Sequence, residues 1–300
     1  EDNTTGYDVV AIGVHAGCEH TTGYQSVYIG TNAGRITTTG HSNVAVGQVA
    51  LDANITGYCN TAIGLGAMGA STGNFNVAVG AFAMAATTSG QNNVAVGKDA
   101  LECNTTGYEN NVFGNEAGDA ITTGFQNAAV GSNALSALTT GDCNSGFGRA
   151  AGDVTTTGDN NTSVGWGSDP SSDSVSHEIT LGNSANNNLR CADTSISSLS
   201  DERDKENIED IPFGLDYINA IRPVKFDWNA RDGSRVGKKD FGFIAQELVT
   251  VEENFGLKEY TRLVSKENPD KLEADPMKTY PILIKAIQEL SAEIEELKKK

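Results

Sequence analysis

The chain has 300 residues and a net charge of −18 at neutral pH, from 39 acidic and 21 basic side chains. This excess of negative charge disfavours nucleic acid and anionic membrane surfaces as partners, so we expect no nucleic-acid binding and no membrane insertion. Residues 1–199 hold 17 acidic and 4 basic side chains, whereas residues 200–300 hold 22 and 17. The change in composition predicts a domain boundary near Ser200.

Cysteine and histidine are scattered along the chain and form no CxxC pair and no metal-ligand spacing. They are Cys18, Cys59, Cys103, Cys143 and Cys191, with His15, His20, His41 and His177. We therefore expect no metal and no cofactor, and we interpret the cysteines as small side chains of a protein made in a reducing cytoplasm. The chain begins at Glu1 without a methionine, and we expect an upstream segment.

A repeat of seventeen residues dominates the first half of the chain. Each copy opens with a Thr-Thr-Gly triplet or a close variant, and a second glycine follows seven residues later. The first glycines are Gly6, Gly23, Gly40, Gly57, Gly73, Gly90, Gly107, Gly124, Gly141 and Gly158. Only the step from Gly57 to Gly73 is sixteen residues. Ten copies in one phase indicate a stacked repeat, with the glycines at corners or close backbone approaches.

Between its two glycines, each copy has the period-two pattern of a β-strand. Val44 and Val46 lie on one face of such a strand, and Asn43 and Ala45 lie on the other. One repeat is too short to bury its own apolar face, so the fold class we expect is a parallel β-solenoid shaft over residues 1–166, with one coil per repeat. The recurring asparagine predicts a ladder of stacked side-chain amides.

The alanine column predicts that the shaft is a trimer. We take the alanine face as the outward face of each strand, where a solitary solenoid would carry polar residues. Alanine in this position indicates that a neighbouring subunit covers it. The Asn-Val-Ala-Val-Gly unit, as at 43–47, also resembles the head repeats of trimeric autotransporter adhesins, and this resemblance implies a trimeric β-roll.

A ring follows the first glycine in six copies of the repeat. These residues are Tyr7, Tyr24, His41, Tyr58, Tyr108 and Phe125. An exposed aromatic column is able to stack on sugars, but such rings more often cover a coil corner by packing, and we favour packing. Both interpretations remain open from the sequence.

Residues 167–199 are rich in serine and asparagine and are expected to form a connector, with one strand-like segment at 178–182. After Gly165 the repeat motif is absent. The following run, Ser-Asp-Glu-Arg-Asp-Lys at 200–205, has a simple structural interpretation. Ser200 or Asp201 caps a helix in which Lys205 pairs with Asp201, four residues earlier.

The wider context gives this run a second interpretation. It precedes Gly-Phe-Ile-Ala-Gln-Glu at 242–247 and Pro-Ile-Leu-Ile-Lys-Ala-Ile-Gln at 281–288. In this order the motifs resemble the intramolecular chaperone domain of phage endosialidases, tail spikes and tail fibres, over about the last hundred residues. The resemblance implies a small α+β domain at 200–300 that trimerises, templates the folding of the upstream β-fibre and is then released by cleavage.

The same resemblance implies which residues perform this cleavage. The scissile bond is Leu199–Ser200, Ser200 is the nucleophile and Lys205 is the general base. A serine hydroxyl needs a neighbour that accepts its proton, and a lysine can do so once desolvation or nearby positive charge favours its neutral form. The activity expected is therefore that of a single-turnover serine auto-endopeptidase, and no multiple-turnover enzyme is expected.

The last segment, about residues 280–300, predicts a coiled-coil helix. Leu283, Ile287, Leu290, Ile294 and Leu297 alternate spacings of four and three, which is a heptad seam. A short amphipathic helix can instead dock on its own domain. We expect a three-stranded bundle because the seam has five positions.

Together these features predict a segment of a bacteriophage tail fibre or tail spike for host attachment. We expect a homotrimer assembled in the host cytoplasm and working on the virion tail, with a host surface receptor, glycan or protein, as its partner. A bacterial trimeric surface adhesin is one alternative. The shaft of a glycan-degrading tail spike is another, and its enzyme domain would lie upstream of Glu1.

Overall fold

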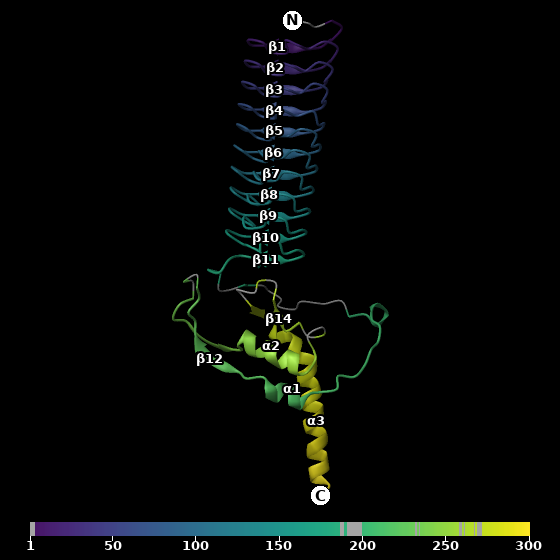
Figure 1. Cartoon of the computed structure of the whole chain (residues 1–300), viewed down its shortest axis with the longest axis vertical. Coiled ribbons are helices and arrows are strands. Elements are labelled where there is room, and N and C mark those ends of the chain that lie inside the picture. Colours follow the sequence, from purple (N-terminus) through teal and green to yellow (C-terminus); the bar gives the residue numbers. More distant parts are fainter. Residues whose placement is uncertain are drawn as a thin grey trace. The chain divides into compact units, whose positions relative to one another are not determined.

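The chain forms two compact units, Glu1–Asn183 and Ser184–Lys300 (Figure 1). The computed structural model describes residues 4–186, 189–190, 200–231, 233, 235–257, 260, 262–266, 268 and 272–300.

The first unit is a parallel β-solenoid with one three-residue strand per coil, as the repeat predicts (Figure 1). The strands are β1 (Val10–Ile12), β2 (Val27–Ile29), β3 (Val44–Val46), β4 (Thr61–Ile63), β5 (Val77–Val79), β6 (Val94–Val96), β7 (Asn111–Phe113), β8 (Ala128–Val130), β9 (Ser145–Phe147), β10 (Thr162–Val164) and β11 (Ile179–Leu181). They pair in sequence order in one sheet. Partner residues are seventeen positions apart, as in Val10↔Val27, except between β4 and β5, where they are sixteen apart.

The sheet continues by one coil beyond residue 166, the expected end of the shaft. β11 pairs with β10 in the same register, Thr162↔Ile179, although the repeat motif is absent there. Glu178 replaces the ladder asparagine, and its backbone N–H donates to Asn161 Oδ1 at 3.0 Å. The eleventh coil therefore forms without the repeat motif, because its backbone pairs with the tenth coil in the same register.

The two faces of each strand are opposite to the sequence expectation. The alanines at the centre of the strands are fully buried inside the coil in β3, β4, β5, β6 and β8, and only Ala11, in the first coil, is exposed. The flanking valine and isoleucine side chains point outward and are half-buried or exposed. The outward Ile63 and Phe147 are 39% and 44% exposed. The interpretation of alanine as the outward face was wrong. The coil interior has little room at the centre of the strand, so alanine is the commonest residue there and the larger residues lie outside. The fully buried Tyr28 of β2 fits at this position because Gly17 and Gly34 lie against its ring.

The asparagine ladder is confirmed. In each of the central coils, the Oδ1 of one asparagine accepts the backbone N–H of the asparagine in the next coil, as from Asn110 to Asn93 at 2.9 Å. The same side chain donates through Nδ2 to a glycine carbonyl of the next coil, as from Asn93 to Gly107 at 2.9 Å. These amides are fully buried, so the ladder satisfies backbone groups that water does not reach.

Both glycine columns are required by close approach between coils. A Cβ at Gly80, which has a φ of +143°, would lie 2.2 Å from the carbonyl oxygen of Gly97. A Cβ at Gly73 would lie 1.8 Å from that of Gly90. The coils also turn at residues other than glycine whose backbone has the left-handed conformation, such as Leu51 with a φ of 50°. The sequence pattern did not predict these.

The aromatic column is a stack of rings along one corner of the shaft. The centroids of Tyr24 and His41 are 4.5 Å apart, those of His41 and Tyr58 are 5.0 Å apart, and both pairs are nearly parallel. Phe75 extends this stack from the side, at 5.1 Å from Tyr58. The ring faces therefore pack mainly on one another.

The second unit is a small α+β domain, as expected. Its elements are η1 (Glu202–Asp204), α1 (Leu215–Ala220), β12 (Val224–Asp227), β13 (Lys239–Gly242), α2 (Ala245–Asn254), β14 (Val264–Ser265), β15 (Glu273–Ala274), η2 (Pro276–Thr279) and α3 (Tyr280–Lys298). β12 pairs antiparallel with β13, and β14 with β15. Tyr217, Val251 and Ile282 join α1, α2 and α3 in one apolar core.

Helix α3 docks on its own domain at its first turns only. Ile282 and Ala286 are buried there, and Glu289 accepts the Leu215 backbone N–H at 2.8 Å. The expected seam lies on another side of the helix. Leu283 is half-buried, whereas Ile287, at 61%, and the following seam residues through Leu297 are exposed. The domain thus leaves most of the seam uncovered.

Candidate functional site

The run that begins at Ser200 folds into a tight turn. η1 is a single turn of 3₁₀-helix in which the backbone N–H of Lys205 donates to the Glu202 carbonyl at 3.1 Å. A 3₁₀-helix rises about 2.0 Å per residue, whereas a strand rises about 3.3 Å. The turn therefore shortens the path between Ser200 and Lys205 enough for their side chains to meet.

The Lys205 amine contacts Ser200 twice. Nζ lies 2.7 Å from Ser200 Oγ and 3.0 Å from the Ser200 carbonyl oxygen. A general base must lie within about 2.6–3.2 Å of the hydroxyl oxygen whose proton it takes, and this pair meets that requirement. Both side chains are exposed in the single chain. Leu199, the other residue of the predicted scissile bond, lies outside the described residues.

Asp201 pairs with Arg203 rather than with Lys205. Its Oδ1 accepts the Arg203 backbone N–H at 2.9 Å, which caps η1, and also accepts Arg203 Nε at 3.0 Å. Its Oδ2 accepts Arg203 Nη2 at 2.6 Å. The Arg203 guanidinium and backbone N–H lower the pKa of Asp201, and this pair raises the pKa of Arg203. The predicted cap is present at Asp201, but the ion pair predicted between Asp201 and Lys205 is wrong.

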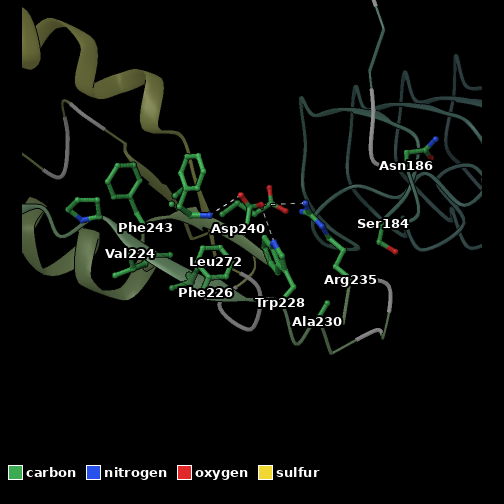
Figure 2. Close-up of a pocket in the computed structure, with 16 residues that line it drawn as sticks. Ser184, Asn186, Val224, Phe226, Trp228, Ala230, Arg235, Asp240, Phe243 and Leu272 are labelled. Carbon is green, nitrogen blue, oxygen red and sulfur yellow. Dashed lines mark hydrogen bonds and ion pairs between the residues drawn. The ribbon is translucent and has the colours of Figure 1, made fainter. Parts of the chain in front are cut away.

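The second unit also has an open, mainly apolar groove of about 910 Å³ beside β12 and β13 (Figure 2). Phe226, Trp228 and Phe243 are among the residues that line it. Its polar groups satisfy one another, because Asp240 accepts Trp228 Nε1 at 3.2 Å and pairs with Arg235 at 3.8 Å. The groove thus offers an apolar surface on which Asp240 and Arg235 are paired with each other.

Metal-binding clusters and membrane-spanning helices are not found in the described part of the chain. No group of three or more His, Cys, Asp or Glu side chains there is arranged to hold a metal ion. No helix within the same residues is long and apolar enough to cross a membrane.

The comparison with protein families matches the part of the chain that contains the turn. Residues 200–257 match the chaperone of endosialidase family. The match begins at Ser200 itself and includes η1, α1, β12, β13 and α2. We refer to the second unit from Ser200 onward as the chaperone domain. No curated protein and no solved structure matches the chain.

A match to this family at residues 200–257, later in the chain than a parallel β-solenoid, indicates a protein of the tail-spike or tail-fibre type. Of the residues that the resemblance named, the structure brings Ser200 and Lys205 together. It adds Arg203, whose contact with Asp201 the sequence analysis missed. A basic residue two positions after an acidic one was the only signal for that pair.

Proposed function

We propose that the chain is one subunit of a trimeric fibre, and that its chaperone domain drives trimerisation and is then released by self-cleavage between Leu199 and Ser200. The observation that carries this proposal is the contact of 2.7 Å between Lys205 Nζ and Ser200 Oγ at the start of a chaperone-of-endosialidase match. That family implies assembly as a trimer. Two uncovered apolar surfaces, on the shaft and on α3, support the same state.

The outward face of the shaft is the first of these surfaces. Neither outward position of any strand from β1 to β11 carries a charged side chain, in a chain whose net charge is −18. The second outward position is apolar in all eleven strands, and the first is polar only at Thr61, Asn111, Ser145 and Thr162. Eleven strands about 4.8 Å apart and about 10 Å long give an area on the order of 500 Å². Solitary soluble proteins rarely expose larger contiguous apolar patches. A second copy of the chain fits this face because it repeats the same spacing.

A charge on the outward face tests this interface. Val96→Lys places an ammonium in the contact and is expected to yield monomers or unfolded chains by light scattering. Gln91→Lys adds the same charge to the same coil at an exposed position, and trimers are expected to persist. Trimers of equal stability from both variants would contradict the assignment of this face.

The exposed seam of α3 is the second surface. Leu290 and Ile294 are 45% and 49% exposed and continue the heptad beyond the docked first turns. Three such helices, packed along their seams, would hold three chains together with equivalent residues in one register. This supplies the template that short coils need, since each coil buries little surface before its neighbours form.

Cleavage at this position has a defined chemical course. Ser200 Oγ attacks the carbonyl carbon of Leu199, and its proton passes to the neutral Nζ of Lys205. The bond from that carbon to the Ser200 nitrogen breaks, and the nitrogen takes the proton from the Lys205 ammonium. Because the nucleophile directly follows the bond, the product is an ester between Leu199 and Ser200 Oγ. Water hydrolyses this ester to a Leu199 carboxylate and restores the hydroxyl.

Trimerisation provides the condition under which the base acts. An amine accepts a proton only in its neutral form, and removal from water favours that form. Lys205 is exposed in the single chain, so its enclosure by neighbouring subunits would couple cleavage to assembly. The uncut chain thus keeps its chaperone until the trimer has formed.

Substitutions at the two residues test the chemistry. Ser200→Ala is expected to give uncut, folded trimers, because alanine removes the nucleophile and little volume. Lys205→Ala removes the base and is expected to do the same, and Lys205→Arg does not rescue it because guanidinium stays protonated. Lys225→Ala, at an exposed position on β12, is the control and should cleave normally. Cleavage of trimeric Ser200→Ala chains would contradict the assignment.

We propose that the fibre is part of a virion tail and attaches the virion to a glycan or protein on the host surface. The solenoid and the chaperone match support this proposal through the type of protein they indicate. Binding of the labelled, cleaved shaft to bacterial cells tests it, with cells stripped of surface polysaccharide as the comparison. A shaft that binds none of a broad panel of intact bacteria would count against attachment.

A further inference from the structure

Lys205 lies in a strongly acidic part of the sequence but does not pair with an acid there. Four carboxylates surround it in the chain: Asp201, Glu202, Asp204 and Glu206. All four are exposed and lie within four residues of Lys205. Among the described residues, Lys205 makes no ion pair within 4.0 Å, and its amine contacts Ser200 instead. At least one of these carboxylates, that of Asp201, is engaged elsewhere in the turn.

Asp201 is the carboxylate best placed to capture the amine. It directly follows Ser200 and precedes Lys205 by four residues, a spacing at which helical ion pairs form. Such a pair would withdraw the amine from Ser200 Oγ and would favour the protonated form, which cannot act as a base. An available Asp201 carboxylate would thus oppose self-cleavage in two ways.

Arg203 occupies both oxygens of this carboxylate. Arg203 Nε lies 3.0 Å from Asp201 Oδ1 and Arg203 Nη2 lies 2.6 Å from Asp201 Oδ2, which makes the ion pair bidentate. The planar guanidinium matches a carboxylate in this way, whereas a lysine amine would engage it as a single point. The same Asp201 Oδ1 also caps η1 through the Arg203 backbone N–H, so the carboxylate is fixed at the start of the turn.

We propose that Arg203 is a positioning residue for self-cleavage, which holds the Asp201 carboxylate and so leaves the Lys205 amine to Ser200 Oγ. The inference rests on the proposed function. It assigns Asp201 two roles that can be separated by substitution. Its cap orders the turn, whereas its charge, without Arg203, competes for the base.

Four full-length chains test the proposal: wild type, Arg203→Ala, Asp201→Asn and the double variant. They are made by cell-free synthesis, and the cleaved fraction of the trimers is followed over time and over pH. Asn is as good an N-cap as Asp but has no charge, so Asp201→Asn should cleave within about threefold of wild type. Arg203→Ala should cleave about tenfold more slowly near neutral pH, with its pH–rate profile displaced upward by about one pH unit.

The double variant provides the decisive comparison. It lacks both the arginine and the competing charge, and its rate and pH profile should return to those of Asp201→Asn. If it stays as slow as Arg203→Ala, or if Arg203→Ala cleaves like wild type, the proposed role of Arg203 is overturned. Arg203→Gln repeats the comparison should the alanine variant fail to form trimers. Trimeric wild type that never cleaves would instead contradict the proposed function itself.

Discussion

Removal of one rung of the asparagine ladder tests the account of the shaft. In Asn93→Ala, the backbone N–H of Asn110 loses its acceptor, Asn93 Oδ1 at 2.9 Å. The carbonyl of Gly107 loses the Asn93 amide but keeps a donor, Asn104 Nδ2 at 3.2 Å. One buried donor without a partner costs about 1–3 kcal/mol. The lost amide volume adds about 1 kcal/mol, so we expect a destabilisation of about 2–4 kcal/mol.

Hydrogen exchange followed by mass spectrometry measures this effect coil by coil. At about 1.4 kcal/mol per tenfold, amides around Asn110 should exchange about 30- to 1,000-fold faster in the variant. Gln91→Ala is the matched control, because Gln91 belongs to the same coil and is exposed. It should change stability by less than about 0.5 kcal/mol. Equal protection in both variants would refute the reasoning that the amides hold neighbouring coils together.

Three further changes probe the packing, the electrostatics and the assembly. Gly80→Ala should prevent stacking, because its Cβ would lie 2.2 Å from the next coil's carbonyl oxygen, whereas Gly69→Ala has its nearest neighbour at 3.7 Å and should fold, as circular dichroism would report. Burial and the nearby Asp153 charge raise the pKa of Asp169 to about 6, so the shaft should gain stability as pH falls through about 6 towards 4. Denaturant titrations should show that Asp169→Asn is more stable than wild type at pH 8. They should also show that the variant lacks the rise in stability that wild type gains as the pH falls. Truncation before Tyr280 removes α3 and should yield monomers or insoluble chains, and soluble trimers from it would make the helix dispensable.

The regular part of the fold could be predicted from the sequence because its period is carried by residue types with few alternatives. Glycine marks the positions where coils approach too closely for a Cβ, and asparagine marks those where one side chain both donates and accepts between coils. The faces of the strands could not be assigned in the same way. Alternation separates Val46 from Ala45 but does not say which side is inside, and the narrow coil places alanine there.

Two other features depended on contacts that no local pattern encodes. The eleventh coil persists because Glu178 supplies the backbone N–H that the ladder requires, so the end of the motif was not the end of the sheet. At the candidate site, the resemblance named Ser200 and Lys205; the structure shows that Lys205 Nζ lies 2.7 Å from Ser200 Oγ, and their roles in cleavage stay a prediction. The partner of Asp201 depended on the conformation of one turn, and spacing alone favoured Lys205 over Arg203.

The most direct test of the account is the intact mass of freshly made wild-type protein, measured on the same samples as its oligomeric state. We predict trimers in which the chain is divided after Leu199, into fragments of about two-thirds and one-third of its length, with uncut chain confined to species that have not yet assembled. Abundant trimers of the intact 300-residue chain, with no fragment that begins at Ser200, would contradict it.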